Sequence, residues 1–172
     1  MEKKITTHIT KGVVLALILI VIDVISSVAG FKFETWFRWL PTLLFCGYII
    51  WACINYADQM NNEVTFGKVF GHGFRTSSVV ASIMVIYVVL SLFIIFPEQK
   101  EQVVEATRKQ LEDKGNVPQS AIDTALEYTR KLYTPIAIMS AIIGSLLVGA
   151  IASLIGAAIA KKNPSSPFQQ QA

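Results

Sequence analysis

The chain alternates between long apolar runs and short polar segments. Runs with little or no charge cover about residues 12–30, 38–57, 76–97 and 133–160. A helix that crosses a bilayer needs about 20 mainly apolar residues. The pattern therefore predicts an all-α polytopic membrane protein. We expect four transmembrane helices in an up-down-up-down bundle, formed as a single domain by residues 1–162.

The polar segment between the third and fourth runs has a helical pattern of its own. Apolar residues recur at helical spacing on both sides of a break at Lys114-Gly115-Asn116. We predict an amphipathic helical hairpin over about residues 98–131, which lies against the membrane face or caps the bundle. A ligand- or partner-binding cap is the alternative. Residues 163–172, with proline, serine and glutamine, are predicted to be a disordered tail.

Composition agrees with a membrane protein. The chain of 172 residues is 53% hydrophobic and only 16% charged, whereas soluble domains average about 25% charged residues. The net charge of +3 is too small to suggest nucleic acid. The partner that composition predicts is the lipid bilayer itself.

The first run has a second interpretation. Lys3, Lys4 and Lys11 precede it, and Ser27-Val28-Ala29 resembles the cleavage site of a secretory signal peptide. Asp23 within the run and the spans that follow favour a retained helix. The basic start also favours a cytoplasmic N-terminus. We therefore expect a multi-pass protein of the bacterial inner (cell) membrane with both termini in the cytoplasm.

Asp23 is the one ionisable residue within a predicted span, because no Lys, Arg or His lies in any of them. Matching depths along antiparallel helices predicts a candidate intramembrane polar site, which comprises Asp23, Tyr48, Tyr87, Ser91, Ser140 and Ser145. A functional site is the usual interpretation of a charged residue inside a membrane. Adhesion between helices is the alternative, and we favour it.

Two further patterns concern helix contacts. The fourth run has small residues at every fourth position, a helix-packing ridge formed by Ala141, Ser145, Gly149, Ser153 and Ala157. Small residues let helices approach closely, and we expect this ridge to pack within the chain rather than against a second subunit. An interfacial loop or helix before the third run is predicted from Phe66, Phe70 and Phe74, which share one helical face.

The sequence predicts no catalytic residue, no metal site and no cofactor. Neither H-E-x-x-H nor G-x-S-x-G occurs. Cys46 and Cys53 lie seven positions apart in one apolar run, about 10 Å apart on a helix. That separation excludes a disulfide between them. We expect buried, inert thiols and a protein that is not an enzyme.

The order of these features resembles a known family. The run from Val64 to Phe74 leads into the third span, a polar hairpin follows, and Tyr133-Thr134-Pro135 opens a last span rich in small residues that ends at Lys161-Lys162. The chain is similar, over about residues 4–162, to the bacterial membrane family catalogued as domain of unknown function forty-one ninety-nine, found chiefly in Bacteroidetes. The resemblance implies a four-span inner-membrane protein and assigns no activity and no functional residues.

Two functions are compatible with these features. The first is a non-enzymatic membrane component that engages a partner protein or lipid, as a homo-oligomer or with an unidentified membrane protein. The alternative is a small proton- or solute-coupled transporter that uses the polar site around Asp23. A cavity beside Asp23 would favour the alternative, and a sealed, hydrogen-bonded carboxyl would favour the first.

Overall fold

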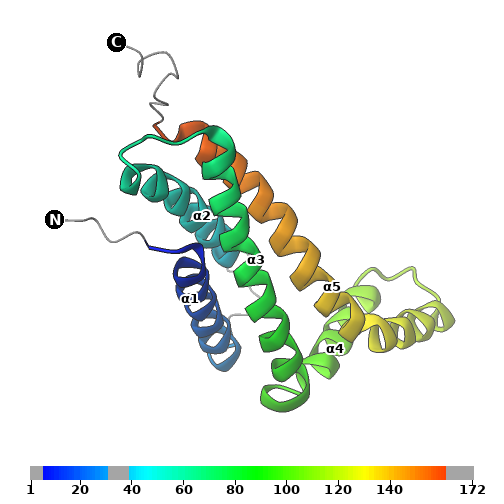
Figure 1. The fold of residues 1–172 in the computed structure, drawn as a ribbon. Helices are drawn as coiled ribbons and strands as arrows, with labels where there is room; N and C mark the ends of the chain where they lie inside the picture. Colours follow the sequence, from blue (N-terminus) through cyan, green and yellow to red (C-terminus); the bar gives the residue numbers. More distant parts are fainter. Residues whose placement is uncertain (1–5, 31–38, 162–172) are drawn as a thin grey trace, which may run out of the picture. The chain divides into compact units, whose positions relative to one another are not determined.

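The computed structural model of the protein describes residues 6–30 and 39–161. These residues are helical apart from short connections and contain no strand. The elements follow in the order α1 (His8–Val28), α2 (Leu40–Gln59), α3 (Phe66–Leu90), the π-helical turn η3 (Ser91–Ile95), α4 (Gln99–Glu112) and α5 (Gln119–Ile159) (Figure 1). The all-α prediction is confirmed. Lys3, Lys4 and the predicted tail, 163–172, lie outside the described residues.

Local chemistry explains where the helices begin and end. The hydroxyl of Thr7 accepts a hydrogen bond from the backbone N–H of Thr10 at 3.2 Å and so caps α1. Pro41 stands in the first turn of α2, where a missing N–H costs nothing. After α2 the chain turns at Asn61 and Asn62, which have positive φ values of 53° and 63°. Asparagine tolerates this left-handed conformation better than most residues.

Four helical segments in the described chain are long and apolar enough to cross a bilayer. They are His8–Val28, Leu40–Gln59, Phe66–Ile95 and Gln119–Ile159. Two of them extend beyond the predicted runs. The third begins at Phe66 instead of residue 76, so the predicted interfacial segment and the third span form one continuous helix. The fourth span continues, without a break, a helix that begins at Gln119.

Pro135 explains why the sequence predicts a start for the fourth helix at residue 133, later than the observed start at Gln119. A proline that follows a charged segment and opens an apolar run is typical of a first helical turn. In the structure Pro135 lies inside α5. Proline removes only its own N–H from the helical hydrogen-bond ladder, and a helix can continue past it with a local distortion.

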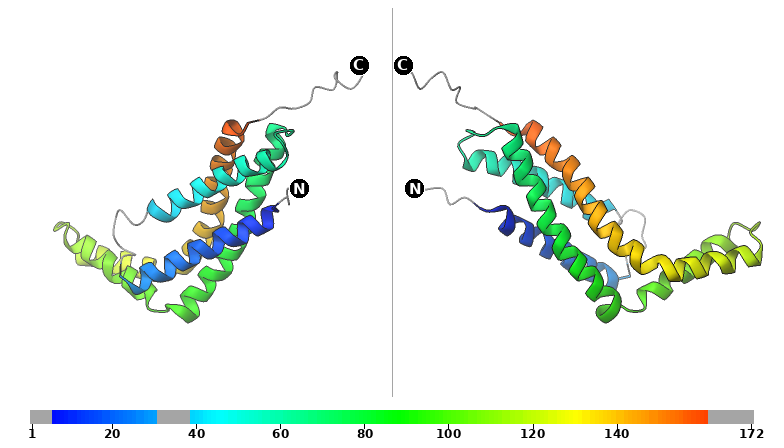
Figure 2. Two further views of the ribbon diagram at one scale, coloured as in Figure 1. Left: turned by 90° about the vertical axis from the view of Figure 1, so that its left-hand side faces the viewer. Right: turned by 45° about the vertical axis from the view of Figure 1, so that its right-hand side comes forward.

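The described helices divide into two compact units. The first comprises Met1–Met84 with Ile143–Ala172, and the second comprises Val85–Ile142. In the first unit α1, α2, the first part of α3 and the last part of α5 lie side by side (Figures 1 and 2). Its principal core cluster takes residues from all four helices: Leu15, Ala16, Leu19, Phe45, Ile49, Val80 and Ala152.

A second core cluster shows which helix ends meet in the first unit. It contains Cys53 and Ala57 near the end of α2, Val69 near the start of α3, Ala157 near the end of α5, and Ala160 directly after that helix. The start of α1 joins the same end of the unit, because the backbone N–H of Thr6 donates a hydrogen bond to Oε1 of Gln59 at 3.0 Å. The end of α2 is therefore linked to the starts of α1 and α3.

The outer faces of these helices are apolar. On α1 the large hydrophobic side chains that remain exposed include Val13, Leu17, Val21 and Ile25, which recur at helical spacing opposite the buried face. Similar exposed residues occur on the other long helices, among them Leu43, Ile86, Leu147 and Ile151. Soluble monomers rarely expose so much contiguous apolar surface. The pattern is typical of helices that face lipid.

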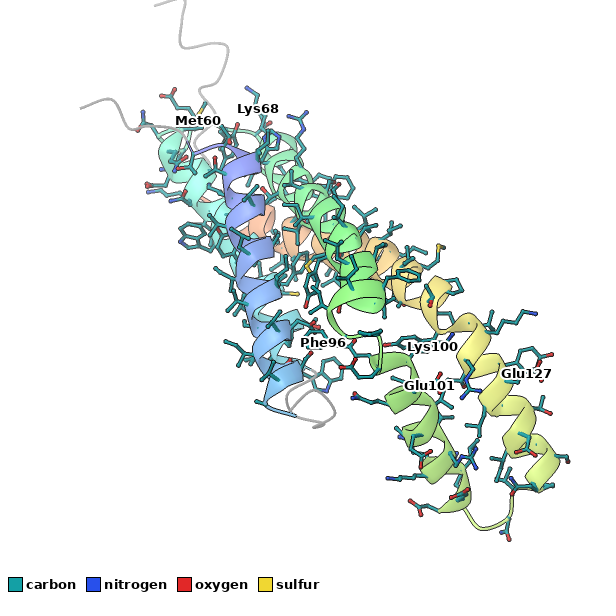
Figure 3. The ribbon with its side chains drawn as sticks, turned by 90° about the horizontal axis from the view of Figure 1, so that it is seen from below. Met60, Lys68, Phe96, Lys100, Glu101 and Glu127 are labelled. Atoms are coloured by element: carbon teal, nitrogen blue, oxygen red, sulfur yellow. The ribbon has the colours of Figure 1, made fainter. Side chains whose placement is uncertain are left out.

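The second unit has a small core of its own. Val104 of α4 packs with Ile122 and Leu126 of α5, and Leu111 and Val117 adjoin them. Gly115, in the connection between the two helices, has a φ of +69°, which glycine adopts without strain. Nη2 of Arg130 donates a hydrogen bond to the carboxylate of Glu101 at 2.6 Å. Figure 3 shows Glu101 on α4 and Glu127 on α5 among the charged side chains of this unit.

Candidate functional site: a pocket around Asp23

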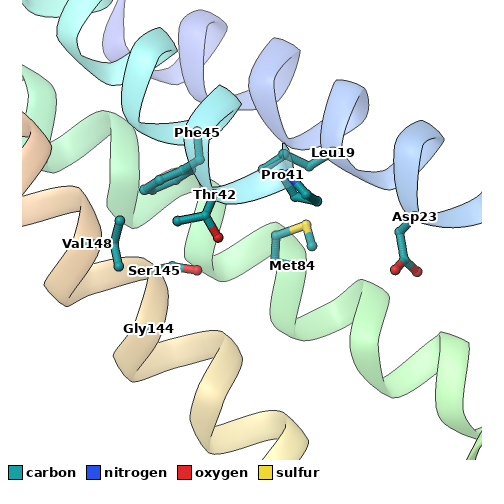
Figure 4. Close-up of a pocket in the computed structure, with 9 residues that line it drawn as sticks. All are labelled: Leu19, Asp23, Pro41, Thr42, Phe45, Met84, Gly144, Ser145 and Val148. Atoms are coloured by element: carbon teal, nitrogen blue, oxygen red, sulfur yellow. The ribbon is translucent and has the colours of Figure 1, made fainter. Parts of the chain in front are cut away.

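Asp23 lines a cavity of about 280 Å³ within the first unit. All four helices of that unit contribute to it: Leu19 and Asp23 of α1, Pro41, Thr42 and Phe45 of α2, Met84 of α3, and Gly144, Ser145 and Val148 of α5. Figure 4 shows Asp23 projecting from α1 toward the space between that helix and α3. The side chains of Thr42, Ser145 and Met84 are turned toward the same region.

The helical repeat explains how these residues meet. Leu19 and Asp23 are four positions apart and so share one face of α1, the face that also buries Leu15. On α2 the residues come from the first two turns, and Phe45 is itself part of the principal core cluster. The pocket is therefore a continuation of that core toward the end of α1.

The chemistry of the pocket is mostly apolar with three polar groups. One is the carboxyl of Asp23, and the others are the hydroxyls of Thr42 and Ser145. None of the nine described lining residues is basic. The volume equals that of about nine water molecules at roughly 30 Å³ each. It is close to the lower end of the size range for ligand pockets, about 300–1,000 Å³.

Gly144 keeps one wall of the pocket open. A Cβ atom at this position would meet no other atom within 4 Å. Gly149 of the same helix is different, because its Cβ would lie 2.4 Å from the side chain of Ser77. Gly144 therefore provides space, whereas Gly149 permits close contact between helices.

The structure brings together part of the predicted polar site. Asp23 and Ser145 both line the pocket. Tyr48 does not: it packs against the principal core cluster, and its ring centroid lies 5.2 Å from that of Trp51. Tyr87, Ser91 and Ser140 belong to the second unit. Of these, Tyr87 and Ser91 are buried and Ser140 is exposed.

Thr42 is not included in the polar site that the sequence predicts. Thr42 lies in the first turn of α2, whereas matching residues by their depth in the membrane pointed to Tyr48, near the middle of that span. Its signal in the sequence is a hydroxyl residue directly after Pro41 at the start of an apolar run. Other buried hydroxyls have a structural role. Those of Thr76, Ser77 and Ser153 donate hydrogen bonds to carbonyls four residues back in their own helices, at 2.8, 3.1 and 2.6 Å.

The expectation that no Lys, Arg or His lies in a span needs correction. Lys11 lies within α1 and is only 2% exposed. Lys68, His72 and Arg75 lie within α3, and His72 is buried as well. The spacing of Lys11, Leu15 and Leu19 on one helical face was the signal that could have found the buried lysine.

From Ser145 onward, the predicted ridge on α5 faces the other helices of the first unit, whereas Ala141 belongs to the second unit. Gly149, Ser153 and Ala157 are buried, and Ala141 and Ser145 are half-buried. The ridge meets small residues on the neighbouring helices. A Cβ added to Gly73 of α3 would lie 2.4 Å from Sγ of Cys53 and 2.7 Å from Oγ of Ser153. These contacts lie within the chain, in agreement with a ridge that packs against neighbouring helices rather than a second subunit.

The remaining predicted groups also have defined positions. Phe66, Phe70 and Phe74 lie in the first turns of α3, where Phe66 is exposed while Phe70 packs against the second core cluster and stacks on Phe74. The phenylalanine face is thus partly turned inward. Both cysteines are free, and Cys53 is buried with its thiol 3.7 Å from the carbonyl oxygen of Val69. The described residues contain no cluster of His, Cys, Asp and Glu that could hold a metal ion.

Comparison with known proteins identifies the family. No curated protein and no solved structure matched the chain. A family model matches residues 10–162, which include all four apolar helices except the first two residues of α1. The resemblance drawn from the segment before the third span and from the last span is confirmed. The chain belongs to the family described as Protein of unknown function (DUF4199).

Proposed function

We propose that the protein binds a small, mostly apolar cation inside the membrane, in the pocket around Asp23, and that it does so without enzymatic activity. One observation supports this proposal above others. A carboxyl group lines a cavity of about 280 Å³ whose other described lining is apolar except for two hydroxyls. Such a cavity matches a ligand with an apolar body and a single positively charged group, such as a protonated amine.

Electrostatics favours that ligand. A carboxylate in an apolar environment loses hydration, and an opposite charge nearby restores part of the lost stabilisation. An ammonium group bound in the cavity would lie against the Asp23 carboxyl and supply such a charge. The hydroxyls of Thr42 and Ser145 can accept further hydrogen bonds from the same group.

The pocket bears on the two functions expected from the sequence. A cavity beside Asp23 supports the binding step of a solute-coupled function, with the cation as solute. The other expectation, a component that engages a partner protein or lipid through its polar hairpin, stays a prediction. So does the formation of a homo-oligomer.

We place the protein in the bacterial inner membrane with its four long helices as spans in an up-down-up-down order and both termini in the cytoplasm. The four apolar helices support the spans. The links between the end of α2 and the starts of α1 and α3 support the alternation of direction. Basic residues near the starts of α1 and α3, such as Lys11, Lys68 and Arg75, support a cytoplasmic location for that end.

Asp23→Asn tests the proposed function. In lipid nanodiscs, phenylbutylamine is expected to raise the thermal unfolding midpoint of the wild-type protein, because a ligand that binds the native state stabilises it. Hydrogen bonds to charged groups contribute about 1.5–3 kcal/mol. We therefore expect Asp23→Asn to weaken binding of the amine by about tenfold or more.

Phenylbutanol, which is neutral and of similar size, is the matched probe. It should stabilise the wild-type protein and Asp23→Asn to the same small extent. Ser26→Ala, three positions after Asp23 on α1 and outside the pocket lining, is the control variant and should bind the amine like the wild-type protein. Equal stabilisation of the wild-type protein by the amine and the alcohol would contradict the proposal.

A further inference from the structure

The end of the first unit where α1 begins contains a buried basic side chain, Lys11. Its side chain is 2% exposed although it carries an ammonium group. Nζ donates a hydrogen bond to the carbonyl oxygen of Ala52 at 3.3 Å and lies 5.7 Å from the centroid of the Trp51 ring. No ion pair joins Lys11 to an acidic side chain among the described residues. An ammonium group can donate three hydrogen bonds, so this one retains capacity for an acceptor.

His72 lies near Lys11, because it stacks on Tyr56, one helical turn along α2 from the Ala52 carbonyl that Lys11 binds. It also retains hydrogen-bonding capacity. Its ring stacks on that of Tyr56, with centroids 4.2 Å apart, and meets the ring of His8 edge-on at 6.2 Å. The side chain is 8% exposed, and within the described part of the chain its Nε2 atom has no hydrogen-bond partner. Buried polar atoms of this kind are uncommon and call for an explanation.

The electrostatic surroundings of His72 are basic. His8 of α1 contacts its ring, and Arg75 lies three positions later in its own helix. Arg75 is exposed, so its guanidinium lies at the edge of the group rather than within it. The acidic residues nearest in sequence to this end, Asp58 and Glu63, are exposed. We call His8, Lys11, His72 and Arg75 the basic cluster.

We propose that the basic cluster binds an oxyanion of the phosphate class, either inorganic phosphate or the phosphate of a lipid headgroup. Lys11 supplies a buried positive charge and His72 supplies a buried nitrogen with unused hydrogen-bonding capacity. A phosphate group has several acceptor oxygens and can contact an ammonium, an imidazole and a guanidinium at once. The site is separate from the Asp23 pocket, because the two share no residue.

The fluorescence of Trp51 can report binding at this site directly, because its ring adjoins the ammonium group of Lys11. In a background in which Trp36 and Trp39 are replaced by phenylalanine, its fluorescence is followed in dodecyl maltoside, a detergent without phosphate. Sodium phosphate is added at constant ionic strength, or phosphatidylglycerol is added in mixed micelles. We expect a saturable change in the emission of Trp51 with one of the two additions. Lys11→Met should weaken this response by about tenfold or more.

The controls separate a specific site from general attraction of anions. Lys68→Met removes an exposed charge from the same helix as His72 and should leave the response unchanged. His72→Phe preserves an aromatic ring beside Tyr56 but removes the nitrogen atoms, and it should weaken the response even if Lys11→Met does not fold. A response to phosphatidylglycerol alone identifies lipid as the source, and a response to phosphate alone identifies the free anion. Failure of both additions, or equal responses in Lys11→Met, His72→Phe and Lys68→Met, would overturn the proposal.

Discussion

Gly149→Leu is expected to prevent the first unit from folding. A Cβ atom at this position would lie 2.4 Å from both side-chain atoms of Ser77 and 3.4 Å from Cζ of Phe45. Contacts under 3.0 Å force helices apart, and a leucine adds three further carbon atoms beyond the Cβ. Overpacking of a core commonly costs about 1–3 kcal/mol and occasionally more. We expect the upper part of this range, with little monodisperse protein recovered in detergent and a strongly lowered thermal unfolding midpoint.

Gly47→Leu is the matched control for this prediction. Gly47 lies on α2, is exposed, and has no atom within 4 Å of its hypothetical Cβ. Leucine is favourable on a surface that faces lipid, so this variant should fold like the wild-type protein. If Gly149→Leu also folded normally but lost an oligomeric state, the ridge of α5 would face a second subunit, contrary to the contacts described above.

Gly144→Leu is expected to abolish binding of the amine while leaving the fold intact. Gly144 lines the pocket, and a Cβ at this position meets nothing within 4 Å. A leucine side chain can therefore extend into the cavity and occupy the space that the apolar part of a ligand needs. We expect the thermal unfolding midpoint without ligand to stay the same or rise, because filling a cavity recovers lost contacts. The stabilisation by phenylbutylamine should disappear.

Comparing the two single variants Gly144→Leu and Gly149→Leu makes this prediction specific. Both variants make the same chemical change on the same helix, five positions apart in the sequence. One should remove ligand binding without harming the fold, and the other should remove the fold. Undiminished stabilisation of Gly144→Leu by the amine would show that the ligand binds elsewhere on the protein.

The sequence was sufficient to predict the membrane-spanning helices but not their limits. Runs without charge revealed four apolar helices because a bilayer excludes unpaired charges from its interior. The same rule excludes Lys11 from the predicted first span and the segment from Phe66 to Arg75 from the predicted third span. In the structure they belong to α1 and α3. A lysine can enter a helix bundle when its stem packs along apolar neighbours and its head finds a carbonyl group, as Lys11 does at Ala52.

The pocket was predictable in part for a similar reason. Asp23 was evident as a charge within an apolar run, and Ser145 followed from its depth in the fourth span. The partner residues on α2 were placed about one turn too deep. In the structure Pro41, Thr42 and Phe45 line the pocket, whereas Tyr48 packs against the principal core cluster. Counting residues gives depth along a helix, but the offset between neighbouring helices depends on side-chain packing, which a single sequence does not specify.

The ridge of α5 was easier to foresee. Its small residues recur every four positions, and a helix brings such residues onto one face whatever its neighbours are. The structure adds the identity of the partners, since Gly149 meets Ser77 and Ser153 meets Gly73. These partners could not be inferred because small residues are compatible with many different neighbours.

Photoaffinity labelling tests the central claim, that the Asp23 pocket binds an amphiphilic cation, most directly. A phenylbutylamine derivative with a diazirine group would be irradiated with the protein in nanodiscs, and the modified residues would be identified by mass spectrometry. We predict labels on residues that line the pocket, such as Phe45, Met84 and Val148, with loss of these labels in excess phenylbutylamine and in Asp23→Asn. Labels spread over the exposed apolar faces, or pocket labels that persist in Asp23→Asn, would contradict the claim.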